Sequence, residues 1–193
     1  MKIIFQFSLV ITFILLTAFS CGKKKKDPES LPAITQTGKG TFGCLIDGEL
    51  WWPRHYSNSF MAPRVLSTMY EWNKENERIL TINANYRGRN DNYPKEYLNM
   101  VINTDAIEEK VYLDVSFLGD SLARSGTIYT AMDYRGGPCS TYRSILGDNS
   151  WVLFSRFDTT AHIAAGTFSL NLLNMEDEMD TVKIRDGRFD LYF

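Results

Sequence analysis

Residues 77–86, which read Glu-Arg-Ile-Leu-Thr-Ile-Asn-Ala-Asn-Tyr, decide the fold class. Leu80, Ile82 and Ala84 alternate with polar residues, and Ile79 falls on the opposite side. Neighbouring side chains of an extended strand point to opposite faces, so a period of two indicates a half-buried β-strand. The sequence therefore predicts a strand over this stretch with the Leu80 side facing the core.

The same alternation recurs on both sides of this stretch. Runs rich in Thr, Val, Ile, Tyr and Phe are separated by Gly, Asn and Asp, which is typical of strands and turns. The runs are residues 97–102, 110–117, 126–132, 151–154, 166–172 and 181–184. No convincing amphipathic helix lies between them. We therefore predict an all-β fold, an antiparallel β-sandwich or flattened barrel of about 8–10 strands.

Two Asp-Gly dipeptides mark turns in this pattern. The first, at 47–48, precedes a run that starts near Trp51, and the second, at 186–187, separates 182–184 from 189–191. Asp-Gly between alternating hydrophobic runs is a strong hairpin signal, because both residues tolerate a positive φ. The sequence predicts a hairpin at each dipeptide.

Composition bounds the class of protein. The 193 residues are 44% hydrophobic and 23% charged, which is typical of a globular domain. Residues 31–193 hold 16 basic and 21 acidic side chains without a basic stripe. Binding to nucleic acid needs clustered Lys and Arg to neutralise phosphates, so we predict no nucleic-acid partner.

The first 20 residues follow the pattern of a secretory signal peptide. Lys2 supplies the charged start, residues 3–19 are mostly apolar, and Ser20 precedes Cys21. Ser20-Cys21 resembles the end of a lipobox, so we predict cleavage before Cys21 and lipid attachment to its thiol. Ala18 and Phe19 depart from the usual lipobox residues. They leave two alternatives: ordinary signal cleavage, which releases a soluble protein, and an uncleaved anchor.

A polar segment follows the cysteine. Residues 21–36, with four lysines at 23–26, are predicted to form a lipidated cysteine and a flexible tether, and residues 37–193 the β domain. The lysines are either an anionic-membrane patch or a solvated spacer. The predicted partner of the tether is therefore membrane lipid, through acylated Cys21.

The residue after the lipidated cysteine is Gly22, not the Asp that signals retention. The predicted location is therefore the cell envelope, at the outer membrane, on its periplasmic or surface face.

Two segments carry a resemblance to a known family. Residues 41–51 read Thr-Phe-Gly-Cys-Leu-Ile-Asp-Gly-Glu-Leu-Trp, and residues 182–190 read Val-Lys-Ile-Arg-Asp-Gly-Arg-Phe-Asp. Together they resemble an uncharacterised family of Gram-negative envelope lipoproteins with a β-rich domain behind the lipidated cysteine. The resemblance implies location and fold class, and it implies no activity.

Cys44 and Cys139 are the two cysteines that remain when Cys21 carries lipid. In an oxidising envelope compartment an even pair predicts a disulfide. Two buried thiols, or a nucleophile at Cys139, are the alternatives.

The sequence predicts no catalytic residue, metal or cofactor. His55 and His162 are the only histidines, and no zinc-site spacing or Gly-x-Ser-x-Gly elbow occurs. Residues 176–180 place four acids in five positions, which is either a solvated hairpin loop or a calcium site.

Aromatic residues in polar surroundings are the best candidates for binding. Because adjacent strand residues face opposite ways, one of Trp51 and Trp52 should point out of the core. Trp52, Arg87 and Tyr93 are the candidate ligand-binding residues, since sugar sites combine a ring with polar groups. A Trp at a strand start also commonly packs in the core or at its rim.

We predict a non-catalytic binding or accessory module for a glycan, a peptide or an envelope protein. The alternatives are a polymer-degrading enzyme or a purely structural surface lipoprotein.

Overall fold

The computed structural model describes residues 29–54, 64–72, 76–86, 96–104, 111–112, 126–132, 139–144 and 149–193. Of residues 111–112, 126–132 and 139 it describes the backbone alone. The strands are β1 (Thr41–Ile46), β2 (Glu49–Trp51), β3 (Leu66–Trp72), β4 (Arg78–Tyr86), β5 (Glu96–Asn103), β6 (Val111–Tyr112), β7 (Gly126–Met132), β8 (Cys139–Ser144), β9 (Trp151–Asp158), β10 (Ile163–Asn174) and β11 (Thr181–Tyr192). Every ladder between them is antiparallel, which confirms the predicted all-β class.

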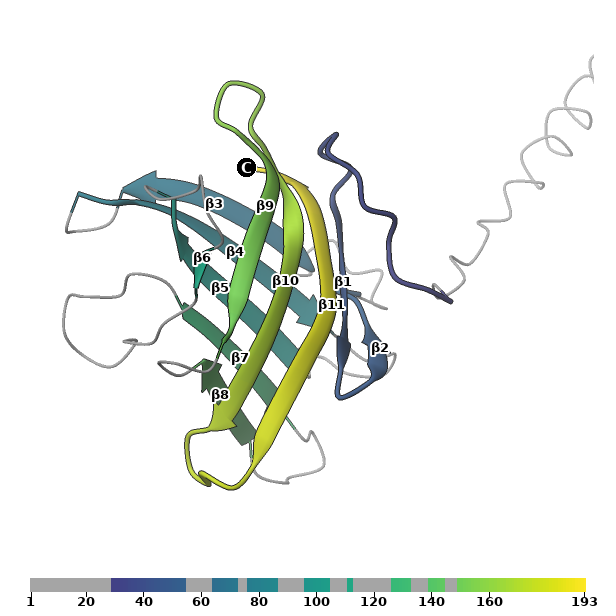
Figure 1. The fold of residues 1–193 in the computed structure, drawn as a ribbon, viewed down its shortest axis with the longest axis vertical. Coiled ribbons are helices and arrows are strands. Elements are labelled where there is room, and N and C mark those ends of the chain that lie inside the picture. Colours follow the sequence, from purple (N-terminus) through teal and green to yellow (C-terminus); the bar gives the residue numbers. More distant parts are fainter. Residues whose placement is uncertain are drawn as a thin grey trace, which may run out of the picture.

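The strands form two layers that cross each other. In Figure 1, β9, β10, β11 and β1 run in front of β3, β4, β5, β7 and β8. The strand order is β2-β1-β11-β10-β8-β7-β5-β4-β3. The first half of β10 pairs with β9 and its last three residues pair with β8, so β10 carries the chain from one layer to the other. Within the described strands no ladder joins β2 to β3, so the sheet stays open as a sandwich.

The core lies between these layers. Leu80, Ile82 and Ala84 of β4 are fully buried, as the alternation predicts. From the opposite layer, β10 contributes Phe168, which is 1% exposed and packs on Phe42 at 5.2 Å between ring centroids. Burial of these apolar side chains is the main stabilising term of the fold.

The first Asp-Gly dipeptide forms the predicted hairpin. Asp47 and Gly48 have φ values of 48° and 89°, and Ile46 pairs with Glu49 across the turn. Both residues of such a two-residue turn need a positive φ. The turn therefore joins β1 to β2 and sets the direction in which Trp51 follows.

The second Asp-Gly dipeptide does not form a hairpin, and that prediction is wrong. β11 continues through it, and Asp186, with φ of 52°, forms a β-bulge. Phe168 pairs with Gly187 and Leu170 with Ile184, so β11 carries one extra residue there. A Cβ on Gly187 would lie 2.4 Å from the Phe168 ring. The glycine serves close packing against that ring as well as local backbone geometry.

Residues 32–38, which we call the strap, are held against the last strand. Arg188 Nη1 donates to the Pro32 carbonyl at 3.0 Å, and Arg156 Nη1 donates to the Gln36 carbonyl at 2.8 Å. Tyr192 Oη donates to the Thr37 carbonyl at 3.3 Å. The predicted boundary between tether and domain, at residues 36 and 37, therefore falls inside a docked segment.

Asp190 is the centre of the strap contacts. Its neighbours Phe189 and Leu191 belong to the core, so the Asp190 side chain points to the outer face of β11, where it is 1% exposed. Its carboxylate accepts hydrogen bonds from Thr35 Oγ1 at 2.6 Å, Gly38 N at 2.6 Å and Thr37 N at 3.1 Å. Burial raises the pKa of Asp190, but these hydrogen bonds to the charged form outweigh it and lower the pKa below the usual range.

Several predictions from the sequence concern residues outside the described ranges. These are the signal peptide (1–20), the lipidated Cys21, the rest of the first half of the tether (22–28), His55, Arg87 and Tyr93. In the part of the chain that the structure describes, no helix has the length and apolar character to cross a membrane.

Candidate functional site

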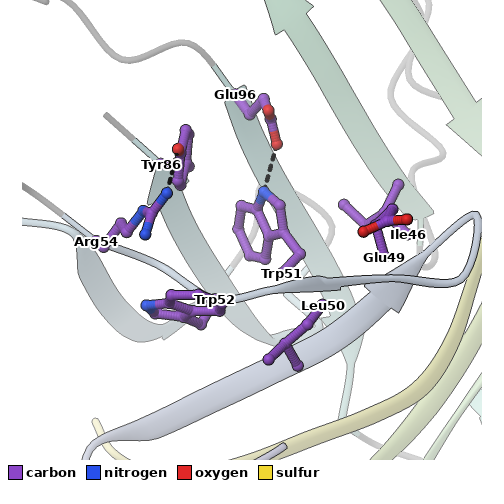
Figure 2. Close-up of a pocket in the computed structure, with 8 residues that line it drawn as sticks. All are labelled: Ile46, Glu49, Leu50, Trp51, Trp52, Arg54, Tyr86 and Glu96. Carbon is purple, nitrogen blue, oxygen red and sulfur yellow. Dashed lines mark hydrogen bonds between the residues drawn. The ribbon is translucent and has the colours of Figure 1, made fainter. Parts of the chain in front are cut away.

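An open hollow of about 260 Å³ lies at the edge of the sandwich, where the two layers meet (Figure 2). We call it the polar hollow. Its walls come from the β1–β2 hairpin and the segment after it, and from β4 and β5 across the layers. The lining residues are Ile46, Glu49, Leu50, Trp51, Trp52, Arg54, Tyr86 and Glu96.

Trp51 joins the two layers at this hollow. Its indole is 7% exposed and packs edge-on against Phe42, with ring centroids 6.2 Å apart. Its Nε1 donates a hydrogen bond to Glu96 Oε2, so β2 is tied to β5 (Figure 2). Trp52 is only half-buried and lines the hollow. Trp52 is therefore the more exposed of the two indoles, although it follows the end of β2 and does not alternate with Trp51 within a strand.

Arg54 fixes the position of the Trp52 ring. Its guanidinium carbon lies 4.8 Å from the centroid of Trp52 and 4.5 Å from the centroid of Tyr86, and one of its nitrogens donates to the Tyr86 hydroxyl. Cations bind the faces of aromatic rings through the ring quadrupole. The backbone N of Arg54 also donates to the Asn85 carbonyl at 3.1 Å. These contacts orient Trp52 before any ligand binds.

Two carboxylates from different strands face this hollow. Glu49 is exposed at the start of β2, and Glu96 is half-buried at the start of β5. Figure 2 shows Glu49 on one side of Trp51, with Trp52, Arg54 and Tyr86 on the other. The hollow thus offers acceptors for hydroxyl and amine groups beside an aromatic wall.

A second hollow of about 220 Å³ adjoins the first, and we call it the apolar hollow. It shares Leu50, Trp51 and Trp52 with the polar hollow. Its other lining residues are Ser30, Pro32, Gly40, Thr41, Phe42, Pro53, Val65 and Leu66. The segment 50–52 is therefore a ridge with a charged hollow and a mainly apolar hollow beside it.

Of the three predicted binding residues, the structure places Trp52 at this ridge. Arg87 and Tyr93 lie in residues 87–95, outside the described part, and that segment connects Tyr86 to Glu96 in sequence. Sequence reasoning missed Arg54, Glu49 and the two residues that flank this segment. No local signal marks them, because the contacts between β2 and the β4–β5 hairpin are non-local.

The predicted disulfide between Cys44 and Cys139 is not present. Cys44 is a free thiol with no exposed surface, and β11 and β10 lie between its strand and β8 in the sheet order. Burial, and secondarily the negative charge of Glu96, raise the pKa of the Cys44 thiol far above its usual range. Disulfide formation needs a thiolate, so this thiol is poorly reactive. The Cys139 side chain is outside the described part.

The acidic run at 176–180 forms the β10–β11 connection. Asp180 accepts hydrogen bonds from Asn174 Nδ2 at 2.7 Å and Tyr142 Oη at 2.8 Å. These two bonds lower the pKa of Asp180, so the charged form is tied to its neighbours. Among the described residues, no three His, Cys, Asp or Glu side chains come together as metal ligands. The described residues therefore give no support for a calcium site at this run.

Comparisons of the chain with protein-family models, with curated proteins and with solved structures gave no match. The resemblance to envelope lipoproteins stays a prediction from the sequence.

Proposed function

We propose that this protein is a non-catalytic carbohydrate-binding module, held in the cell envelope by lipid on Cys21. The observation that carries the proposal is the position of Trp52 on a ridge shared by a polar and an apolar hollow. Sugars have apolar ring faces and polar rims, so an oriented indole beside charged acceptors matches both.

The size of the hollows favours an extended chain over a small buried molecule. Their volumes of about 260 and 220 Å³ are each below the roughly 300–1,000 Å³ of typical small-molecule pockets. An oligosaccharide that crosses the ridge can use both hollows at once. Each sugar then contributes modestly, and the chain gains affinity from several contacts.

A polymer-degrading enzyme is the weaker alternative. Glu49 and Glu96 line one hollow, and glycosidases use pairs of carboxyl groups. One of such a pair is held protonated by an apolar, enclosed setting. Glu49 is exposed and Glu96 lines an open hollow, so neither carboxyl has such a setting, which favours binding over hydrolysis. Release of reducing ends from a polysaccharide on incubation with the protein would support the enzyme instead.

Replacing Trp52 with alanine tests the binding proposal. We expect binding to envelope polysaccharides, including peptidoglycan, to weaken about 30-fold, because buried Trp anchors commonly contribute about 2 kcal/mol or more. Retention of the full chain on immobilised polysaccharide measures the effect. Trp72→Ala is the matched control. Trp72 is 57% exposed and has the Arg78 guanidinium 4.7 Å from its centroid, but it lines neither hollow. Equal losses in both variants would exclude Trp52 as the anchor.

The proposed anchor has a separate test. We expect native protein extracted from membranes to have the mass of residues 21–193 plus acyl chains. Cys21→Ser removes the thiol that accepts the lipid, and we expect that variant to lack the acyl mass. An unacylated native protein in the soluble fraction would contradict the anchor and leave the carbohydrate proposal standing.

A further inference from the structure

We infer that the carbohydrate recognised at the polar hollow carries protonated amines, as a chain of amino sugars without N-acetyl groups does. This inference rests on the proposed carbohydrate binding and specifies its ligand.

The described walls of the hollow carry more negative than positive charge. Among the described residues, the lining includes the carboxylates of Glu49 and Glu96 and the guanidinium of Arg54, a net formal charge of −1. Within the described part of the chain, neither carboxylate forms an ion pair. A neutral sugar would leave both charges without an ion-pair partner, and an acidic sugar would be repelled by them.

The positive charge of Arg54 is directed at aromatic rings. The guanidinium lies over the faces of Trp52 and Tyr86 and donates to the Tyr86 hydroxyl. In this position it serves as a positioning residue for the indole. Glu49 lies on the far side of Trp51 from it, and Glu96 lies at the indole nitrogen of Trp51 (Figure 2).

Glu96 is oriented to accept a further donor. Trp51 Nε1 donates to its Oε2, which fixes the position of the carboxylate in the wall of the hollow. An ionised carboxylate offers about four acceptor positions, so this bond leaves capacity for an amine. Trp51 is neutral and leaves the carboxylate charge in place. The negative charge of Glu96 also contributes to the raised pKa of the buried Cys44 thiol, so the charge acts on groups at this end of the sandwich.

Chitosan and chitin oligomers of equal length provide the probes, because they differ only in N-acetylation of the amine. We would measure binding of each to the full chain in detergent at about pH 5.5, where most amines of the deacetylated oligomer are protonated and most ordinary carboxylates are ionised. We expect the deacetylated oligomer to bind at least about fivefold more tightly, and the preference to fall as salt is added.

Charge-removing variants identify the source of the preference. Glu49→Gln and Glu96→Gln should each reduce the preference for the amine form several-fold, with little effect on the acetylated oligomer. Glu71→Gln is the control, since Glu71 is exposed on β3 and lines neither hollow. Glu49 is exposed, so its variant should fold even where Glu96→Gln disturbs the bond to Trp51. Thermal unfolding of each variant checks this.

The outcomes separate this inference from the proposal beneath it. Equal binding of the two oligomers, lost in Trp52→Ala, would overturn the amine inference and keep carbohydrate binding. A preference reduced as much by Glu71→Gln as by Glu49→Gln would also overturn it, because the attraction would then be non-specific. Binding of neither oligomer would overturn the amine inference, and only a failure on every polysaccharide tested would overturn the proposal as well.

Discussion

Replacing Phe168 with alanine is expected to lower the free energy of unfolding by about 3–5 kcal/mol. The ring is 1% exposed and packs on Phe42 at 5.2 Å and Phe189 at 6.4 Å between centroids. It also fills the space that Gly187 leaves open at the bulge, where a Cβ would lie 2.4 Å from it. Truncation removes buried apolar surface and leaves a cavity that the rigid bulge cannot close. Urea unfolding of both proteins measures the difference.

Leu153→Ala is the control for this prediction. Leu153 lies on the neighbouring strand β9, paired with Thr167, but is 45% exposed. We expect its loss to cost less than about 1 kcal/mol, since surface substitutions seldom cost more. A loss below about 1 kcal/mol for Phe168→Ala would mean that the core does not depend on this ring.

Asp190→Asn is expected to lower the free energy of unfolding by about 2 kcal/mol near neutral pH, because hydrogen bonds to a buried charged acceptor contribute about 1.5–3 kcal/mol. The variant keeps the shape of the side chain and removes its charge. The amide also turns an NH₂ group toward donors from Thr35, Thr37 and Gly38, which the carboxylate accepts. Urea unfolding again gives the size of the loss.

The same carboxylate predicts a dependence on pH. Hydrogen bonds hold the pKa of folded Asp190 below its value in the unfolded chain, near 3.9, despite the opposing effect of burial. Its contribution is therefore complete well above pH 4, and it is lost as pH falls through the lowered folded pKa. The difference in stability between wild type and Asp190→Asn should shrink between about pH 6 and pH 3.

Asp186→Asn is the matched control, since Asp186 lies on the same strand but is exposed. Asn tolerates its left-handed backbone conformation, so we expect little change at either pH. A difference for Asp190→Asn that stays constant over this pH range would contradict the assignment to the ionised carboxylate.

The two Asp-Gly dipeptides show how far local sequence determines this fold. Both adopt the backbone conformations that their composition allows, with Asp47 and Asp186 at positive φ. The first closes a hairpin and the second bulges a continuous strand. Phe168, distant in sequence, packs over Gly187 and keeps β11 straight enough to pair on both sides of the bulge. Tertiary packing decides between the two outcomes, and no local pattern records it.

Two strands escaped prediction for a related reason. β3 is partly exposed along its length, and β8 reads Cys-Ser-Thr-Tyr-Arg-Ser, so neither has the alternation that identifies β4. Both become strands because they pair with neighbouring strands, β3 with β4 and β8 with β7 and β10. The site follows the same rule, since Trp51 meets Glu96 and Arg54 meets Tyr86 only after β2 has been placed across the layers from the β4–β5 hairpin. The sequence could nominate Trp52 because an aromatic pair beside polar residues is expected to place one ring outside the core. The predicted strand start near Trp51 was wrong, since β2 ends at Trp51.

The strap gives the domain a defined response to mechanical load. The strap runs alongside β11 in the same direction, from Pro32 at Arg188 to Thr37 at Tyr192, and the chain then turns back into β1. Thr41 pairs with Asp190 at the open end of the β1–β11 ladder, the end from which a pulled strand would peel pair by pair. A force applied from the N-terminal side acts first on the hydrogen bonds of the strap. The β1–β11 ladder is loaded only after those bonds break. Forced unfolding from the N-terminal side should therefore begin with the bond between Arg188 and Pro32, followed by the contacts of Asp190, before the β1–β11 ladder opens.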